Sequence, residues 1–351
     1  MQKILVYINI ILAISLLLSY LSSFISPTQI GHLALFGLFY PYLLIINVFF
    51  FLFWLITEWK YGAISLLTII LGFNHLSSFY GINSRSVTEE PKDLIKVGSM
   101  NINAGYFFRI NDQALSEQRK DQLKTVFLNN SLDIICLQES NHVVNSFVAS
   151  SLESYHQASE DRTTTSIFSK YPIKDYGSLT INERKNKTCL WADIIVGKET
   201  VRVYSVHLYS NKLTKETEAI IEDRSFGDER MIDDLRYILG SYINSSRKRV
   251  KEMDIILEHV RKSPFPVIMA GDFNDTPQSY SYRQIKNAGF CDAFQDSADG
   301  LGTTYAGSLP LLRIDYCFAD KDRFKTIEHQ IVKKRMSDHF PLISVFKLSR
   351  Q

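Results

Sequence analysis

Residues 266–277 read PVIMAGDFNDTP, and this stretch decides how the rest of the chain is interpreted. The apolar run at 267–270 predicts a buried strand that delivers Asp272 and Asn274 at its end. Side chains alternate between the two faces of a strand, so residues two apart share a face and these two should project together. Such a pair could hold a water, a metal or a phosphate. The same residue types also form ordinary turns, so the remaining sequence must distinguish the two interpretations.

Apolar residues crowd into the first eighty positions of this 351-residue chain, which is 46% hydrophobic. The stretches 4–24, 33–56 and 63–80 are long enough to be considered as membrane spans, against the ~20 apolar residues that cross a bilayer. A second apolar run follows the first almost at once, which favours anchors over a cleaved signal peptide. The third stretch contains Asn74 and His75, so lying in the interface or packing against the other two is its alternative.

Few charges determine the sidedness of these segments. Lys3 precedes the first stretch, Lys60 follows the second, and the connection at 26–32 contains no Lys or Arg. With three crossings the two lysines share a side, which the positive-inside tendency makes cytoplasmic, so the remainder of the chain lies outside the cytoplasm. With two crossings that conclusion reverses.

The charge beyond position 81 is nearly balanced, because removing Lys3, Lys60 and Glu58 from the totals of 39 and 37 leaves 37 basic and 36 acidic residues. No strong basic field indicates a nucleic-acid partner. The local run at 247–249 (Arg-Lys-Arg) is interpreted as the solvated start of a helix.

Cysteines supply no metal-binding spacing. Cys136 and Cys317 lie inside apolar, strand-like runs, which predicts small buried thiols. The even count leaves a disulfide open, and the sequence does not name its pair among Cys136, Cys189, Cys291 and Cys317.

We predict a membrane anchor of about three transmembrane helices over 1–81, a linker over 82–93 and one soluble domain over 94–351. Strand-like runs alternate in that domain with helical patterns, and several neighbouring strands have only short connections. One helical face is formed by Leu123, Val126 and Phe127, and another by Val250, Met253, Leu257 and Val260. The predicted fold class is α/β, with a mixed two-sheet core flanked by helices.

Polar residues gather where the apolar runs of this domain begin or end. Each has an ordinary structural explanation when taken alone, such as a turn or a strand-end hydrogen bond. Their joint order favours a site. They are Asn101, Asn103, Glu139, His207, Asp272, Asn274, Asp315, Asp338 and His339.

In order and spacing, the motifs SMNINAG, LQES, SIFSKYPI, YSVHL, PVIMAGDFNDTP, RIDY and SDHFPL resemble the endonuclease/exonuclease/phosphatase (DNase I-like) superfamily. The resemblance covers about residues 94–348. It implies a four-layered α/β sandwich of two packed sheets with outer helices, and a metal-dependent phosphoesterase activity. GDFN followed by RIDY and a terminal SDH is the specific part of the match, because LQE or an isolated histidine is common.

The resemblance implies Mg²⁺ (or Mn²⁺) as cofactor. Mg²⁺ takes oxygen ligands and is commonly held by one or two carboxylates plus substrate phosphate. Glu139 and Asn101 match the main metal site of the family, and Asp338 matches a carboxylate that helps a metal. Asn103 departs from the Asp that some nucleases of the family carry there, which puts a second metal position in doubt.

The remaining matches concern water and phosphate. Asp272 matches the carboxylate that positions and deprotonates the attacking water, with Asn274 hydrogen-bonding beside it. His339 matches a histidine that donates to a phosphate oxygen, and Asp315 fits the partner that orients it. His207 matches a second phosphate-facing histidine. Substrate binding is thereby expected at Asn101, Asn274, His207 and His339.

The substrate stays open, because family members share this core and differ in their loops. Loops to consider are the aromatic trio at 106–108 and the polar insertion at 209–246. Three hypotheses remain: a membrane-anchored phosphoesterase acting on a lipid head group or other small phosphoester, a membrane-tethered nuclease acting on DNA or RNA, and an inactive binding scaffold. The expected localisation is the cell membrane, multi-pass, with the catalytic domain outside the cytoplasm. No protein partner can be inferred.

Overall fold

The computed structural model describes residues 2–83, 94–109, 111–161, 163–179, 189–210, 230–307 and 309–349. It divides into two compact units. One unit contains the residues up to Tyr80, the described part of 211–251, and 275–285. The other contains the described parts of 81–210, 252–274 and 286–351. The predicted linker at 82–93 lies outside the described residues from 84 onward.

The helices are α1 (Gln2–Leu21), α2 (Leu33–Leu38), α3 (Tyr40–Thr57), α4 (Trp59–Leu71), α5 (Phe73–Leu76), the 3-10 helix η1 (Asn103–Arg109), α6 (Gln113–Asn129), α7 (His142–Ser151), α9 (Arg230–Arg261), α10 (Tyr280–Asn287) and α11 (Ala293–Ser297). The strands are β1 (Tyr80–Ile82), β2 (Leu94–Asn101), β3 (Ile134–Gln138), β4 (His156–Ala158), β5 (Thr165–Ser169), β6 (Ile173–Leu179), β7 (Cys189–Val196), β8 (Glu199–His207), β9 (Val267–Asp272), β10 (Phe290–Asp292), β11 (Asp299–Leu301), β12 (Asp315–Asp320), β13 (Phe324–Ile331) and β14 (Leu342–Leu348).

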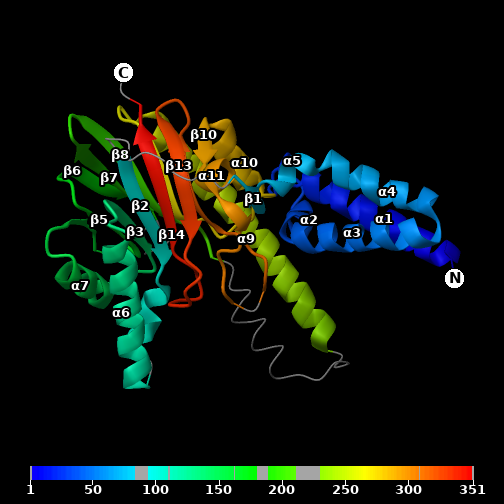
Figure 1. The fold of residues 1–351 in the computed structure, drawn as a ribbon, viewed down its shortest axis with the longest axis horizontal. Coiled ribbons are helices and arrows are strands. Elements are labelled where there is room, and N and C mark those ends of the chain that lie inside the picture. The colour runs from blue at the N-terminus through cyan, green and yellow to red at the C-terminus, as the bar shows by residue number, and fades with distance from the viewer. Residues whose placement is uncertain are drawn as a thin grey trace. The chain divides into compact units, whose positions relative to one another are not determined.

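Two six-stranded mixed sheets form the α/β unit, as the sequence predicted (Figure 1). Their strand orders are β10-β12-β9-β8-β7-β6 and β13-β14-β2-β3-β5-β4. The pairs β8–β9 and β2–β3 run parallel, while the other neighbours in these two sheets run antiparallel. A mixed sheet of this kind needs apolar cover on both faces, which here comes from the opposite sheet and from helices.

Alternation along the strands determines what each face packs against. Ile95 and Val97 of β2 lie in one apolar cluster with Val203 of β8 and Ile268 of β9, so this cluster is the core between the sheets. The opposite face of β2 and β3 packs on α6 and α7 through a second cluster. Leu123, Val126 and Phe127 of α6 belong to that cluster and are buried, which confirms the predicted helical face.

The same alternation carries the strand-end polar residues to the face between the sheets. Asp272 lies two residues after Ala270, a member of the inter-sheet core, and Asn101 lies four after Val97. His207 likewise follows Val203 by four. Residues separated by an even number on a strand share a face, so the core positions and the site positions form one continuous face.

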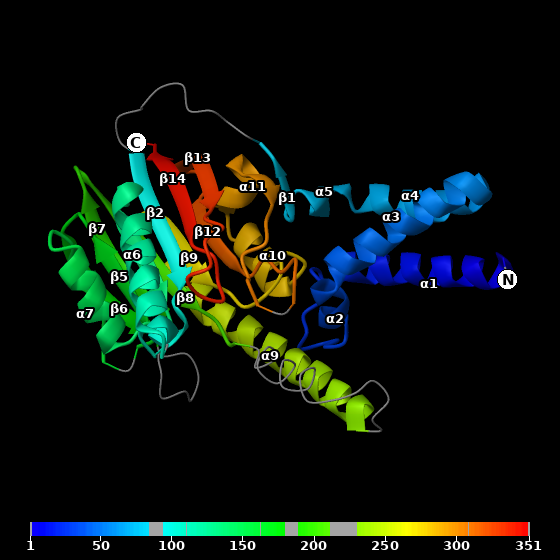
Figure 2. The ribbon, with the colours of Figure 1, turned by 60° about the horizontal axis from the view of Figure 1, so that its bottom comes forward.

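Three apolar helices, α1, α3 and α4, pack together in the N-terminal unit (Figure 2). Buried amides join them: Asn9 Nδ2 donates to the carbonyl oxygen of Tyr61 at 3.0 Å, Ser65 Oγ donates to Asn9 Oδ1 at 2.6 Å, and Asn47 Nδ2 donates to the carbonyl oxygen of Leu12 at 3.2 Å. Interhelical hydrogen bonds of this type are common where apolar helices associate in lipid.

Helices α1 and α3 are long and apolar enough to cross a membrane, and only 28% and 22% of their apolar windows are buried. A core helix of a soluble protein would be mostly buried, whereas a signal sequence near the N-terminus would pass the same test as α1. The sequence stretch 33–56 is interrupted at Phe39, because Pro41 lies in the first turn of α3. The stretch 63–80 contains residues 63–71 of α4, which has 13 residues, then α5 and the first residue of β1.

The run at 247–249 was expected at the solvated start of a helix, and this prediction is wrong. It lies in the interior of α9, and Arg249 is fully buried beside Asp275. A buried guanidinium needs a paired anion, which no local pattern in the sequence could reveal. Of the predicted insertion at 209–246, residues 211–229 lie outside the described part and the rest from Arg230 is helical.

All four cysteines are free thiols. Cys136, Cys189 and Cys317 are buried, as expected for small residues in strands, and burial raises the pKa of the Cys136 thiol well above its usual range. The disulfide left open by the sequence is not formed.

A buried histidine on β13 makes the stability of the α/β unit pH-dependent. Burial, assisted by Arg313, lowers the pKa of His329 to about 3, whereas an unfolded histidine titrates near ~6.5. Protonation of His329 therefore favours the unfolded state, so the contribution of His329 to stability is complete above pH ~6.5 and falls as the pH drops below it, by about 1.4 kcal/mol per pH unit. We expect His329→Gln to remove this slope in denaturant unfolding of the full chain, while the exposed His156→Gln keeps it. Parallel pH profiles for wild type and His329→Gln would contradict the prediction.

Candidate active site

Three neighbouring strands bring their polar ends together. In the register of the sheet, His207 of β8 lies opposite Asp272 of β9, and Asp272 lies opposite Asp315 of β12. The other sheet supplies Asn101, the last residue of β2, and Glu139, which follows β3 directly. Both sheets thus contribute to one cluster, because their strand ends meet across the inter-sheet core.

Asp272 is the central residue of this cluster, with 1% of its surface exposed. Asn101 Nδ2 donates to its Oδ2 at 2.9 Å across the two sheets. The Nε2 atoms of His207 and His339 each lie 3.8 Å from the same oxygen. Burial raises the pKa of Asp272 to about 6, although the neighbouring His339 opposes this shift. The carboxylate is therefore mainly ionised at neutral pH.

Asn274 is held by the turn that follows β9. Its backbone N–H donates to Asp272 Oδ1 at 2.8 Å, its Nδ2 donates to the carbonyl oxygen of Leu208 at 3.2 Å, and its φ is +54°. The strand ends at Asp272, so the two side chains do not share a strand face as the simple two-residue period suggested. The carboxylate instead orients Asn274 by capturing its backbone.

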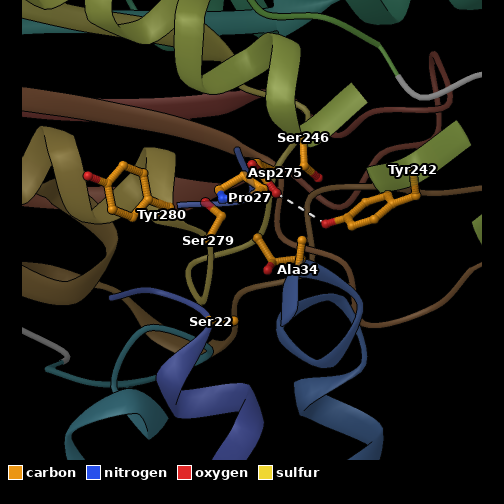
Figure 3. Close-up of a pocket in the computed structure, with 9 residues that line it drawn as sticks. Ser22, Pro27, Ala34, Tyr242, Ser246, Asp275, Ser279 and Tyr280 are labelled. Carbon is orange, nitrogen blue, oxygen red and sulfur yellow. Dashed lines mark hydrogen bonds between the residues drawn. The ribbon is translucent and has the colours of Figure 1, made fainter. Parts of the chain in front are cut away.

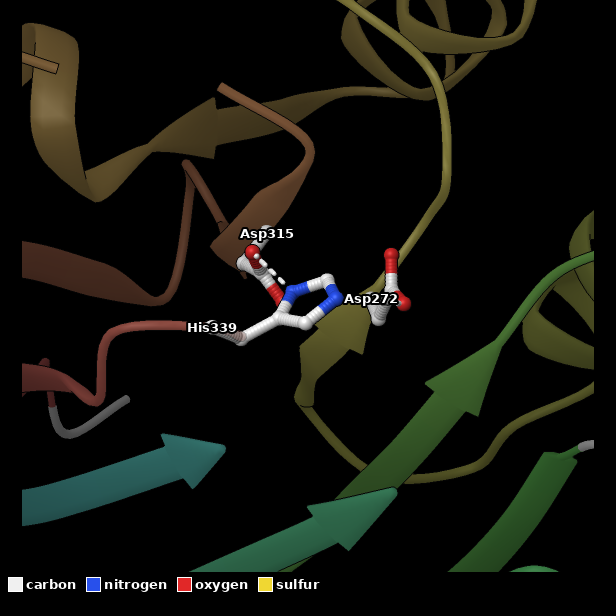
Figure 4. Close-up of side chains that lie close together, drawn as sticks. All are labelled: Asp272, Asp315 and His339. Atoms are coloured by element: carbon white, nitrogen blue, oxygen red, sulfur yellow. Dashed lines mark hydrogen bonds and ion pairs between the residues drawn. The ribbon is translucent and has the colours of Figure 1, made fainter. Parts of the chain in front are cut away.

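His339 and Asp315 form a buried pair (Figure 4). His339 Nδ1 lies 2.9 Å and 3.0 Å from the two carboxylate oxygens of Asp315, which leaves Nε2 directed at Asp272. Burial by itself lowers the pKa of His339, but Asp315 and then Asp272 outweigh it and raise the pKa to about 10. The imidazole is therefore a cation at neutral pH and can donate from Nε2.

Glu139 and His207 form the part of the cluster nearest to solvent. Glu139 accepts from Asn101 Nδ2 at 3.2 Å, lies 3.7 Å from His207 Nε2, and keeps a third of its side chain exposed. Its φ of +50° is a conformation that costs a non-glycine residue roughly 1–2 kcal/mol. Both ring nitrogens of His207 are buried, and neither has a hydrogen-bond partner among the described residues. The strained backbone of Glu139, beside the imidazole of His207, is typical of a ligand-binding site.

Asp338 and Asn103 lie beside this cluster. The Asp338 carboxylate accepts from Ser337 Oγ at 2.9 Å and contributes to the raised pKa of its neighbour His339. Asn103, the position that departs from the family pattern, donates its backbone N–H to Asn101 Oδ1 at 2.9 Å. Asn101 is thus oriented by the main chain of the turn that follows it.

Sequence reasoning missed the residues that support the pair of His339 and Asp315. Thr304 Oγ1 accepts from the backbone N–H of Asp315 at 3.1 Å, and the ring of Tyr305 packs edge-on against His339 with centroids 5.2 Å apart. Both belong to an irregular segment with no periodicity. Only the preference of threonine for backbone hydrogen bonds could have indicated one of them.

Comparison with known families agrees with this geometry. The model described as Endonuclease/Exonuclease/phosphatase family matches residues 98–339. The chain belongs to the endonuclease/exonuclease/phosphatase family, whose members are metal-dependent hydrolases of phosphoester bonds. A separate model, Domain of unknown function (DUF8431), matches residues 2–79. No curated protein matches the chain.

Solved structures share the fold of the α/β unit. An endonuclease/exonuclease/phosphatase from Bacteroides vulgatus has a TM-score of 0.55 and 18% identity, covering 74% of this chain and 100% of its own. A mannosyl-6-phosphatase of Bacteroides thetaiotaomicron has a TM-score of 0.54 and 18% identity, and the match covers 72% of this chain and 99% of the phosphatase. The D. rerio TDP2 complexed with single strand DNA product has a TM-score of 0.51 and 16% identity, and the match covers 72% of this chain and 98% of TDP2. At these identities the likeness shows the fold alone.

The cationic state of His339 depends on one carboxylate. Replacing Asp315 with Asn removes the largest contribution that raises the pKa of His339. Burial, which lowers this pKa, should then dominate, so the pKa of His339 should fall well below about 10. Nitrogen NMR of imidazole-labelled, metal-free protein measures this directly, because the chain has only 8 histidines. The exposed Asp322→Asn is the control. A His339 pKa unchanged by Asp315→Asn would contradict the assignment.

Proposed function

We propose that this chain is a membrane-anchored, divalent-metal-dependent phosphoesterase that hydrolyses its substrate by in-line attack of water. The observation that carries the proposal is the buried carboxylate of Asp272, held by Asn101 and faced by two imidazoles at 3.8 Å. A carboxylate between donors of this kind can accept a proton from water while the imidazoles bind the anion under attack.

Asp272 is the proposed general base. Its Oδ1 accepts the backbone N–H of Asn274 and its Oδ2 accepts from Asn101, so the carboxylate has a fixed orientation. A pKa of about 6 suits a base that operates near neutral pH, since proton transfer is most efficient when the pKa lies close to the working pH. Asn274 would hydrogen-bond to the phosphate from the turn beside it.

The two histidines are the proposed phosphate donors. Asp315 fixes the ring of His339 through Nδ1, which leaves a proton on Nε2 for a phosphate oxygen. In the described part of the chain, neither buried ring nitrogen of His207 has a hydrogen-bond partner, and one of them would bind the same group. Positive charge placed where negative charge develops is typically the largest catalytic contribution in phosphoryl transfer.

Glu139, Asn101 and Asp338 are the proposed ligands of Mg²⁺ (or Mn²⁺). The donor set fits a hard cation, because it consists of two carboxylates and an amide oxygen. Glu139 keeps a third of its side chain exposed and has a strained backbone conformation. A bound cation would neutralise charge at the phosphorus and on the departing oxygen.

A second group of residues could hold a metal on distance alone. One ligand atom from each of Asp272, Asp315 and His339 lies within 4.8 Å of the others. His339 already shares its Nδ1 proton with Asp315, and its raised pKa disfavours the neutral imidazole that a metal needs. We therefore assign this group to proton and phosphate handling.

The proposed substrate is a lipid head group or another small phosphoester. The described relatives include a mannosyl-6-phosphatase, which supports a small phosphoester, and TDP2 with a single strand DNA product, which supports the alternative of a membrane-tethered nuclease. The nearly balanced charge beyond residue 81 favours the first. An inactive scaffold is disfavoured, because chemically competent residues fill every core position of the motif, although Asn103 departs from the Asp of some nucleases.

The anchor is proposed to be α1, α3 and α4 in the cell membrane, with the catalytic domain outside the cytoplasm. Large apolar side chains of α1 and α3 are exposed in the N-terminal unit, among them Ile4, Ile11, Phe49 and Ile56. At 13 residues α4 spans only ~20 Å, less than the ~30 Å of a bilayer core, so a third crossing needs the residues that follow it.

The function is tested by incubating the full chain in detergent with Mg²⁺ against plasmid DNA, RNA, phospholipids and inositol phosphates. We expect hydrolysis of at least one small phosphoester, its loss in EDTA, and its return with Mg²⁺ or Mn²⁺. Turnover that persists in EDTA would reject the metal mechanism, and cleavage of nucleic acid alone would select the nuclease.

The proposed base and donor have matched conservative variants. Asp272→Asn and His339→Gln should each lower kcat by ~10²-fold or more at unchanged folding, because each removes one charged group that acts on the reacting atoms. Asp322→Asn, an exposed carboxylate, should leave kcat unchanged. Near-normal turnover by either site variant removes that residue from the mechanism.

The orientation of the anchor is tested by two fusions at the C-terminus. With three crossings, alkaline phosphatase should be active and green fluorescent protein dark, because only exported phosphatase and cytoplasmic fluorescent protein mature. Bright fluorescence without phosphatase activity would place the catalytic domain in the cytoplasm, as two crossings require.

A further inference from the structure

We propose that the N-terminal helices and α9 together position the segment 275–278, which follows Asn274 directly in the chain. This inference rests on the proposed phosphoesterase function. It assigns a role to the region matched by the model of unknown function: part of the support of the active site, and not a tether alone.

One side of the support is a single face of α9. Tyr242, Ser246 and Arg249 are spaced four and three residues apart, so they lie on one side of the helix. Arg249 Nε lies 3.1 Å from Asp275 Oδ2, and Tyr242 donates its hydroxyl to Asp275 Oδ1 at 3.2 Å. Arg249 also donates to Ser246 Oγ at 2.8 Å.

The charges in this contact are buried. Arg249 is 0% and Asp275 4% exposed. A buried ion pair contributes little net stability, but removing one partner is costly, so its geometry is narrowly defined. The position of Asp275 relative to this face of α9 is thereby fixed.

The other side of the support is the connection between α1 and α3. The hydroxyl of Ser22 lies 2.7 Å from the carbonyl oxygen of Gln278, and Thr276 Oγ1 donates to the carbonyl oxygen of Gly37 at 3.2 Å. The connection also contacts α9, because Arg247 Nε donates to the carbonyl oxygen of Pro27 at 3.0 Å.

Gly37 permits this close approach. A Cβ at this position would lie 2.5 Å from Ser22 Oγ and 3.1 Å from the carbonyl oxygen of Gln278. The side chains that meet there enclose a small polar pocket, to which all three segments contribute, including Ser22, Tyr242, Ser246 and Asp275 (Figure 3). The contact is therefore packed at van der Waals distance.

The segment 275–278 affects catalysis because it is covalently joined to Asn274. Asp275 shares a peptide bond with Asn274, whose N–H orients the carboxylate of Asp272. A displacement of the segment would move that N–H, and misplacement of a catalytic group by ~1 Å can cost ~10²-fold in rate. The residues at 22, 37, 249 and 275 are thus positioning residues.

The test compares Gly37→Ala with Gly240→Ala in the full chain in detergent. Both glycines lie in helices, and a Cβ at Gly240 would have nothing within 4 Å. The substrate is bis(p-nitrophenyl) phosphate, which is water-soluble and so does not depend on docking to a bilayer. We expect Gly37→Ala to lower kcat by about tenfold or more with KM within twofold of wild type, and Gly240→Ala to change neither.

Hydrogen–deuterium exchange of the peptide over 275–280 supplies a readout independent of activity. Exchange should be faster in Gly37→Ala than in wild type or Gly240→Ala. Arg249→Met should behave as Gly37→Ala, and Arg249→Lys, which keeps the charge, should recover part of the rate.

The proposal is overturned if Gly37→Ala keeps wild-type kcat or wild-type exchange. A wild-type chain that hydrolyses no phosphoester would refute the proposed function instead. Hydrogen–deuterium exchange would then test only whether the N-terminal helices support residues 275–280. Unchanged protection of this peptide in Gly37→Ala rejects that support, and faster exchange upholds it.

Discussion

The hydrogen bond from Asn101 to Asp272 is the interaction on which the proposed active site depends. It joins the end of a strand in one sheet to the end of a strand in the other, and a second buried contact between the sheets, from Gln138 Nε2 to Ser205 Oγ at 3.1 Å, lies between it and the apolar core. A carboxylate buried this deeply loses its hydration, which raises its pKa to about 6 even with two imidazoles and Asn101 beside it. The charge of His339 opposes this shift most, and the hydrogen bond from Asn101 acts in the same direction, so the contact between the sheets helps to keep Asp272 ionised at neutral pH. The relative placement of the two sheets therefore determines whether Asp272 receives this hydrogen bond, and so affects the chemistry of the site.

Sequence patterns predicted most of this α/β unit, because its strands are buried on both faces and end in motif residues. The strand before Asp272 required only a continuous apolar run, and the helical face around Leu123 required only helical periodicity. β13 was not predicted, because it mixes buried and exposed residues irregularly. Thr304 was also missed, since its role arises from a contact between distant segments. Arg249 was placed in solvent for the same reason: only the fold brings Asp275 to it.

The region before residue 81 does more than anchor the chain in our proposal, because it packs with other segments in one compact unit. One unit joins the N-terminal helices to residues 275–285, which directly follow the GDFN motif. The charged contact of Arg249 with Asp275 and the close approach at Gly37 hold this segment from two sides. A protein cut at the predicted linker would lose one of these sides, so the full chain is the relevant form for enzymology.

The most direct measurement is anomalous diffraction at the manganese edge from crystals of the full-length Asp272→Asn variant with Mn²⁺ and inorganic phosphate. We expect a manganese peak at the carboxylate of Glu139 and a phosphate whose oxygens reach His207 and His339. A manganese peak between Asp315 and His339, with none at Glu139, would contradict it.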